Sequence, residues 1–103
     1  MSIKGSLEPD NSTLRIEIDG RFDFTLHKDF REIYTNSNSN TKVSKYIIDL
    51  TATNYMDSSA LGMLLLLREY AGGDSAQIEV TGCNSEIKEI LEISNFDRLF
   101  KIN

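Results

Sequence analysis

The chain has 103 residues, of which 40% are hydrophobic and 26% are charged, and its formal net charge is −5. This length is enough for one compact domain with a single core and too short for two, so we expect one domain over residues 1–103. The negative charge and the scattering of the eleven Lys and Arg residues argue against direct nucleic-acid binding, which needs a basic face to neutralise phosphates.

The sequence also argues against membrane insertion, secretion and metal chemistry. The longest apolar run, residues 63–67, is far shorter than the roughly 20 residues that cross a bilayer. The opening residues, MSIKGSLEPD, lack the apolar stretch of a signal peptide, and the single cysteine cannot form an intrachain disulfide. His27 and Cys83 are too few soft ligands for a catalytic metal site, although carboxylates could still hold Mg or Ca. We therefore expect a cytoplasmic protein without a metal or other cofactor.

The first part of the chain predicts two strands. Residues 3–7 are a short strand candidate, followed by turn-forming residues at 8–11. In residues 13–19, TLRIEID, every second residue is apolar, which indicates a strand with one buried face. We expect Gly20 to end this strand.

Residues 25–35 predict the first helix. Thr25 can serve as its N-cap, and the polar run at residues 36–40 is expected to end the helix in a loop. The apolar residues share one helical stripe, and they are Leu26, Phe30, Ile33 and Tyr34.

The second half of the chain alternates strands with helices. Residues 45–50, KYIIDL, predict a buried strand, because the apolar residues Tyr46, Ile47, Ile48 and Leu50 are nearly continuous. Residues 51–57 are expected to connect this strand to a second helix over residues 58–70, which ends at Gly72-Gly73-Asp74. Residues 77–81, QIEVT, alternate again and predict another strand.

A third helix is predicted over residues 85–93. Residues 99–102 are a candidate for a last strand. The apolar stripe of this helix is Ile87, Ile90 and Leu91, with Ile93 as an optional further member. The order ββαβαβα(β) predicts an α/β fold with a mixed open sheet, because helices between the later strands favour parallel crossovers. Three amphipathic helices are few to cover two sheet faces, so we expect them mainly on one face.

The segment Asp57-Ser58-Ser59 lies where the loop after a buried strand becomes a helix. Loops at the carboxyl ends of strands in open α/β sheets are the usual place for a site. The first turn of a helix has unpaired N–H groups, and a phosphate there is favoured by about 0.3–1 kcal/mol when it is exposed. The alternative is simple N-capping, since Asp and Ser are preferred helix starters.

The helical repeat of 100° per residue separates the two serines. The predicted buried side of this helix holds Ala60, Met63, Leu64, Leu67 and Ala71. Ser58 lies opposite that side, on a face shared with Gly62, Leu65 and Glu69, and Ser59 lies at its edge. A kinase would therefore reach Ser58 more easily than Ser59. An exposed leucine beside a glycine suits a partner-docking surface, although cover by a neighbouring loop explains Leu65 equally well.

No catalytic arrangement is visible in the sequence, so we expect a protein that is not an enzyme. His27 lies in the predicted first helix and is expected to be a surface residue. Neither Ser58 nor Ser59 lies in the GxSxG motif that presents a nucleophilic serine. Cys83 follows a predicted strand, and we expect it to be a structural, neutral thiol.

Three local motifs resemble the STAS domain family of bacterial anti-sigma factor antagonists. Residues 20–23, GRFD, resemble the G-x-x-D segment of that family, and residues 47–50, IIDL, resemble its central strand. Residues 56–62, MDSSALG, closely match its MDSSGLG phosphorylation segment. The predicted element order agrees with the family over nearly the whole chain.

The resemblance implies a non-catalytic, phosphorylation-controlled switch. The unphosphorylated form would bind an anti-sigma factor that is also a serine kinase, and phosphorylation of Ser58, or less favourably Ser59, would release it. A PP2C-type phosphatase would restore the unphosphorylated form. Asp57 would stand beside the acceptor and Asp23 close to the same surface, so that the expected partner-binding residues are Asp23, Asp57, Ser58, Ser59, Gly62, Leu65 and Glu69.

The family also leaves a second hypothesis open. A STAS accessory subunit can dock constitutively on a transporter ATPase or another regulatory assembly, with the same helix as a fixed docking face and Ser58 only as a cap. Neither hypothesis determines an oligomeric state.

Overall fold

The computed structural model describes residues 2–10, 12–37 and 43–103. Its sheet has the strand order β1-β2-β3-β5-β6, in which β1 is antiparallel to β2 and the later pairs are parallel. A further strand, β4, pairs in parallel with the far end of β2. The strands are β1 (Ser2–Leu7), β2 (Thr13–Phe22), β3 (Lys45–Asp49), β4 (Thr53–Met56), β5 (Ile78–Thr81) and β6 (Lys101–Ile102).

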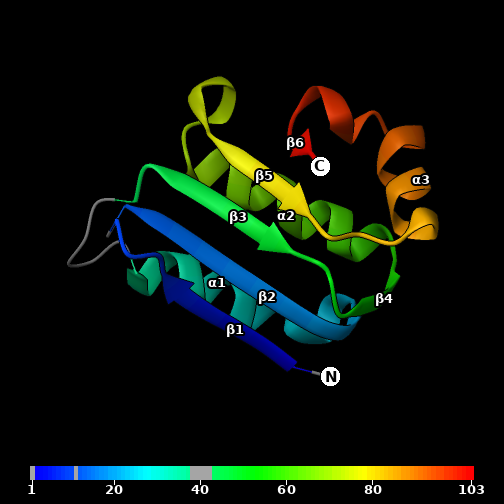
Figure 1. The fold of residues 1–103 in the computed structure, drawn as a ribbon, viewed down its shortest axis with the longest axis horizontal. Coiled ribbons are helices and arrows are strands. Elements are labelled where there is room, and N and C mark those ends of the chain that lie inside the picture. Colours follow the sequence, from blue (N-terminus) through cyan, green and yellow to red (C-terminus); the bar gives the residue numbers. More distant parts are fainter. Residues whose placement is uncertain (1, 11, 38–42) are drawn as a thin grey trace.

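Two helices cover one face of the sheet, and the third lies at its end. Figure 1 shows α1 (His27–Ser37) and α2 (Ser58–Tyr70) behind the strands, and α3 (Ser85–Ile93) beyond the carboxyl ends of β3 and β5. Three 3-10 turns, Phe24–Leu26, Gly73–Ser75 and Phe96–Arg98, complete the regular structure. The predicted α/β fold with a mixed sheet and helices mainly on one face is therefore confirmed.

The core lies between the sheet and α1 and α2. Alternate residues of the strands point into it, as the period of two predicts. These buried strand residues are Leu14, Ile16, Ile18, Tyr46, Ile48, Ile78 and Val80. The helices contribute Phe30 and Tyr34 from α1 and Leu64 and Leu67 from α2, which are all at most 4% exposed.

The opposite face of the sheet carries charged side chains in place of a helix layer. Arg15 of β2 forms an ion pair with Asp49 of β3 at 2.8 Å, and Lys45 of β3 pairs with Glu79 of β5. Charged side chains on three adjacent strands neutralise one another, so this face needs no covering helix.

The prediction that Gly20 ends the second strand is wrong. Gly20 adopts a positive φ of 90°, and the strand register shifts between Gly20 and Arg21, but β2 continues to Phe22. The prediction that residues 51–57 are only a connection is also wrong, because they contain β4, whose partner is this continuation of β2. Glycine permits the irregular backbone that carries the strand onward.

The predicted start of the first helix is also corrected. Asp23, not Thr25, is the N-cap, and a 3-10 turn precedes the α-helix, which begins at His27. Asn36 and Ser37 belong to the end of α1, so the predicted loop is wrong for these two residues. Residues 38–40 of that predicted loop lie outside the described residues.

Two expectations near the carboxyl end change as well. Ile93 is 73% exposed and does not belong to the buried stripe of α3, because the helix ends there and Ser94 is already its C-cap. The last strand is only Lys101–Ile102, because the chain reaches the sheet through the 3-10 turn Phe96–Arg98. Helices over residues 58–70 and 85–93 agree with the prediction.

Candidate functional site

Two helix starts lie side by side at one edge of the sheet. Phe22 of β2 is the register partner of Met56 of β4, and the next residue in each strand is an aspartate, Asp23 or Asp57. Each aspartate is the N-cap of the helical segment that follows it. Parallel pairing of β2 and β4 therefore brings together two residues that are separated by 34 positions in the sequence.

Asp57 holds the first turn of α2 through three hydrogen bonds. Its Oδ1 accepts from the backbone N–H of Ser59 at 3.1 Å, from that of Ala60 at 3.2 Å and from the hydroxyl of Ser59 at 2.6 Å. The capping that residue types alone suggested is thus present, and it uses Asp57 and Ser59.

Asp23 repeats this arrangement in the neighbouring turn. Its Oδ1 accepts from the backbone N–H of Thr25 at 3.0 Å and from the Thr25 hydroxyl at 2.5 Å. In both turns, the residue between the aspartate and the hydroxyl-bearing residue points outward: Phe24 is 62% exposed, and Ser58 is also exposed.

The two serines of the segment differ in what their hydroxyls do. Ser59 is half-buried and donates its hydroxyl hydrogen to Asp57. Within the described residues, the Ser58 hydroxyl has no hydrogen-bond partner. Ser58 is therefore the serine whose hydroxyl is available to a second molecule.

The two aspartates are ionised at neutral pH. Donation from the Ser59 hydroxyl and from backbone N–H groups lowers the pKa of Asp57, despite the opposing effects of burial and of the Asp23 charge. The pKa of Asp23 is lowered by the Thr25 hydroxyl and backbone N–H and by Arg21. Two negative charges thus lie at the start of α2.

The exposed face of α2 agrees with the predicted helix phase. Ala60, Met63, Leu64 and Leu67 are buried, as expected, and Ala71 is half-buried. On the opposite side, Ser58, Gly62 and Glu69 are exposed and Leu65 is 39% exposed, so no loop covers that leucine fully. A Cβ added at Gly62 would meet no atom within 4 Å.

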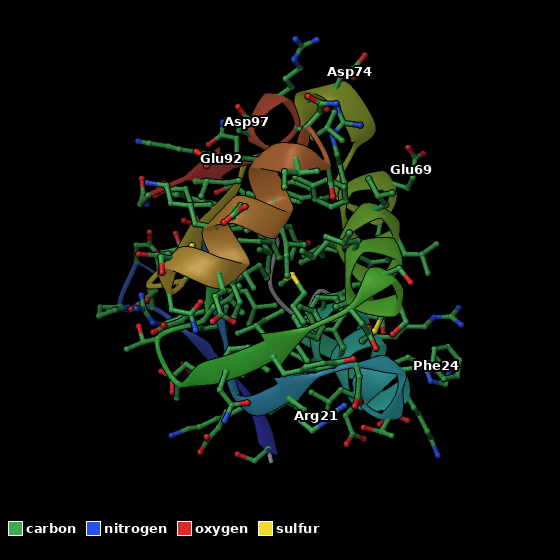
Figure 2. The ribbon with its side chains drawn as sticks, turned by 90° about the vertical axis from the view of Figure 1, so that its right-hand side faces the viewer. Arg21, Phe24, Glu69, Asp74, Glu92 and Asp97 are labelled. Atoms are coloured by element: carbon green, nitrogen blue, oxygen red, sulfur yellow. The ribbon has the colours of Figure 1, made fainter. Side chains whose placement is uncertain are left out.

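Figure 2 shows how far this face extends. Phe24 lies near the start of α2, and Glu69 lies towards the other end of the helix. Glu69 is eleven positions after Ser58, which corresponds to about 16 Å along the helix axis. The predicted site residues therefore form one strip, with the two aspartates and both serines at one end.

Three exposed residues near the paired aspartates were not predicted from the sequence, namely Arg21, Phe24 and Tyr55. The Arg21 guanidinium lies 3.8 Å from the centre of the Tyr55 ring and forms an ion pair with Asp23 at 3.3 Å. Phe24 stacks on His27 with ring centroids 4.2 Å apart. A signal for Phe24 was present in the sequence: D-F-T at residues 23–25 repeats the pattern D-S-S at residues 57–59.

The positions of His27 and Cys83 agree with the prediction of a surface histidine and a structural thiol. His27 is exposed at the start of α1, and Cys83 is half-buried, with burial raising the pKa of its thiol. Among the described residues, no group of three or more His, Cys, Asp or Glu side chains is placed to hold a metal ion. In the same part of the chain, no helix is long and apolar enough to cross a membrane.

Comparison with known proteins identifies the family. The model of the STAS domain matches residues 6–103. The chain belongs to the STAS domain family. A STAS-domain containing protein of Pseudomonas aeruginosa is 48% identical over 103 residues, which cover the whole of both chains. STAS domains are generally non-catalytic binding and regulatory domains.

Solved structures show the same STAS fold at low sequence identity. A putative anti-sigma factor antagonist of Thermotoga maritima has a TM-score of 0.81 and 16% identity, covering 97% of this chain and 84% of the other. The unphosphorylated anti-sigma factor antagonist SpoIIAA has a TM-score of 0.67 and 15% identity, with coverages of 94% and 96%. A sulfate transporter family protein of Wolinella succinogenes has a TM-score of 0.72 and 12% identity, with coverages of 92% and 79%.

Proposed function

We propose that this STAS domain is a cytoplasmic partner switch controlled by phosphorylation of Ser58. The unphosphorylated form binds an anti-sigma factor with serine kinase activity, and a PP2C-type phosphatase resets the switch. The observation that carries the proposal is the contrast between the two serines: Ser58 is exposed with a free hydroxyl among the described residues, whereas the Ser59 hydroxyl is bound to Asp57. SpoIIAA, which shares the fold, has been solved in unphosphorylated and phosphorylated forms.

The partner is proposed to dock on the strip that begins at Ser58 and runs along α2. The absence of a side chain at Gly62 leaves open space on the helix surface, and Leu65 and Phe24 supply exposed apolar area to the strip. Asp23, Asp57 and Glu69 place negative charges around these apolar side chains, and the partner surface that faces Ser58 is proposed to be apolar. Apolar contacts flanked by charges are the usual composition of a specific interface.

Phosphorylation would oppose this docking without changing the fold. A phosphate adds about −1.5 to −2 charges next to Asp57 and Asp23, and the N-terminus of α2 offsets only part of that charge. A phosphate within the interface must also lose its water. Every 1.4 kcal/mol of lost binding free energy weakens the complex about tenfold.

The acceptor is tested by phosphorylation in vitro. Wild-type protein, Ser58→Ala and Ser59→Ala are incubated with ATP and each serine-kinase-type anti-sigma factor encoded in the same genome, and the product is mapped by mass spectrometry. We expect phosphate on Ser58 in the wild type and in Ser59→Ala, and none in Ser58→Ala. Phosphate on Ser59 alone, or no phosphate with any kinase, would reject Ser58 as the acceptor.

The switch itself is tested by affinity for the same kinase. Ser58→Ala is expected to keep wild-type binding, and Ser58→Asp to weaken it at least tenfold, as measured by calorimetry. Ser85→Asp is the matched control, since Ser85 is the exposed first residue of α3 and the substitution adds the same charge at another helix start. Equal weakening by both aspartates would mean that the effect comes from overall charge.

The likeness to a sulfate transporter family protein supports a second candidate, a docking subunit that binds a transporter ATPase constitutively. Ser58 would then only start the helix. Affinity purification of the wild type and Ser58→Ala distinguishes the two functions. Recovery of transporter components by both variants, without phosphate on the wild type, favours the docking subunit.

A further inference from the structure

A groove between α1 and α2, on a different side of α2 from the Ser58 strip, has the size and lining of a small-molecule site. Its cavity volume is about 390 Å³, which falls within the range of about 300–1,000 Å³ typical of ligand pockets. Phe30 and Tyr34 of α1 and Met63 of α2 form its buried floor. Leu66 and Tyr70, which are 64% and 44% exposed, form the α2 wall.

The floor is part of a continuous series of aromatic contacts that ends in the groove. Phe22 contacts Phe30 with ring centroids 5.7 Å apart, Phe30 contacts Tyr34 at 5.5 Å, and Tyr34 contacts Tyr70 at 5.0 Å. The first three rings are buried, whereas Tyr70 is partly open to solvent. A flat aromatic ligand would extend this series with the tilted and edge-on contacts that aromatic rings favour.

The charge at the groove is positive although the chain is negative overall. Arg31 lines the groove together with His27, and no Asp or Glu does. The acidic residues of α1, Asp29 and Glu32, line a separate groove towards β1. Arg31 forms no ion pair with the described residues, so its guanidinium is available to an anion.

Arg31, Tyr34 and Tyr70 supply polar groups to the same groove. The Tyr34 and Tyr70 rings have centroids 5.0 Å apart, and Arg31 precedes Tyr34 by three positions on α1, a spacing that puts both on one helix face. Tyr34 makes no hydrogen bond within the described part of the chain. A guanidinium beside phenol hydroxyls matches a carboxylate, because arginine binds the two carboxylate oxygens with parallel hydrogen bonds.

We propose that the α1–α2 groove binds a small aromatic carboxylate, with the ring against Phe30, Tyr34 and Tyr70 and the carboxylate at Arg31. This site does not depend on the Ser58 switch, because its lining residues are separate from those of the docking strip.

The experiment is an NMR titration of the full ¹⁵N-labelled chain with 2-naphthoate. Saturable shifts are expected for amide signals of α1 and α2 along the groove, with α3 and the open sheet face unchanged. The neutral analogue 2-naphthamide should bind the wild type at least tenfold more weakly. Absence of saturation, shifts spread over the whole surface, or equal binding of the amide would overturn the proposal.

Substitutions distinguish specific binding of the carboxylate from nonspecific binding of the ligand to apolar surface. Arg31→Gln should weaken naphthoate at least tenfold and leave naphthamide binding unchanged, whereas Tyr70→Ala should weaken both ligands. Arg98→Gln is the matched control, since Arg98 is an exposed arginine in the turn after α3 and should have no effect. If Arg31→Gln and Arg98→Gln behave alike, Arg31 does not bind the carboxylate.

Discussion

Asp57 shows how one side chain both starts a helix and presents a neighbouring residue. Its carboxylate binds the N–H groups of Ser59 and Ala60 and the Ser59 hydroxyl, which leaves Ser58 outside the hydrogen-bonded turn. The same division occurs at Asp23, where Thr25 is bound and Phe24 is left exposed. At these two helix starts the residue between the aspartate and the hydroxyl side chain is exposed. Asp49 binds Thr51 in the same way where no helix begins, and there the intervening Leu50 is buried.

We expect Asp57→Ala to lower the free energy of unfolding by about 1 kcal/mol at neutral pH, because the first turn of α2 loses its cap. Its hydrogen bonds, with that from the Ser59 hydroxyl the strongest, lower the pKa of Asp57 in the folded protein. The stabilisation is therefore complete above the unfolded pKa of about 4 and is lost as the pH falls through the lower native pKa.

Urea denaturation of wild type and Asp57→Ala between neutral and acidic pH tests this expectation. The difference in stability should shrink below a pH of about 4. Asp74→Ala is the control, because Asp74 is fully exposed and contributes only a surface ion pair with Arg68, worth about 0–1 kcal/mol. A stability difference for Asp57→Ala that does not change with pH would contradict the role of the carboxylate.

At the scale of elements, α2 places four consecutive leucines in opposite environments. Leu64 and Leu67 are completely buried, Leu65 is 39% exposed and Leu66 is 64% exposed. The run LLLL has no periodicity of its own, so the flanking residues decide its orientation. Ala60 and Met63 on the buried side and Ser58, Gly62 and Glu69 on the other establish the phase.

This phase predicts a large difference between two chemically identical substitutions. Leu64→Ala should lower the free energy of unfolding by about 2–5 kcal/mol, because it leaves a cavity between α2 and the sheet. Leu66→Ala should change it by less than about 0.5 kcal/mol. Chemical denaturation of both variants measures the contrast, and similar losses would show that Leu66 is covered by protein.

At the scale of the whole molecule, the sheet has one face covered by helices and one face held by ion pairs. Arg15 lies at the centre of the second face and contacts Asp49 at 2.8 Å, Glu8 at 3.4 Å and Glu17 at 3.8 Å. These contacts join β2 to β3 and to the turn that follows β1. The half-buried position of Arg15 and Asp49 makes this pair stronger than an ordinary surface pair.

Arg15→Gln should lower the free energy of unfolding by about 1 kcal/mol at low ionic strength. The loss should be smaller in 1 M NaCl, where charges are screened beyond about 3 Å. Thermal or urea unfolding of both proteins at the two salt concentrations provides the test, with Arg98→Gln as an exposed arginine control. A loss that is the same at both salt concentrations would argue against an electrostatic role.

Local pattern in the sequence was enough to predict much of the fold and part of the site. Alternation predicted the buried faces of β2 and β5, and helical spacing predicted both ends of α2 and α3 and the outward direction of Ser58. These features depend on residues a few positions apart, for which side-chain spacing directly reflects backbone geometry.

The tertiary structure alone decided the features that depend on distant residues. β4 is a four-residue strand with polar residues and no clear period, and it exists because β2 continues past Gly20 to pair with it. That pairing places Asp23 next to Asp57, and the packing of α1 against α2 creates the groove at Arg31. Such contacts join segments about thirty residues apart, so no local pattern encodes them, and only the packed chain shows what lies beside Ser58.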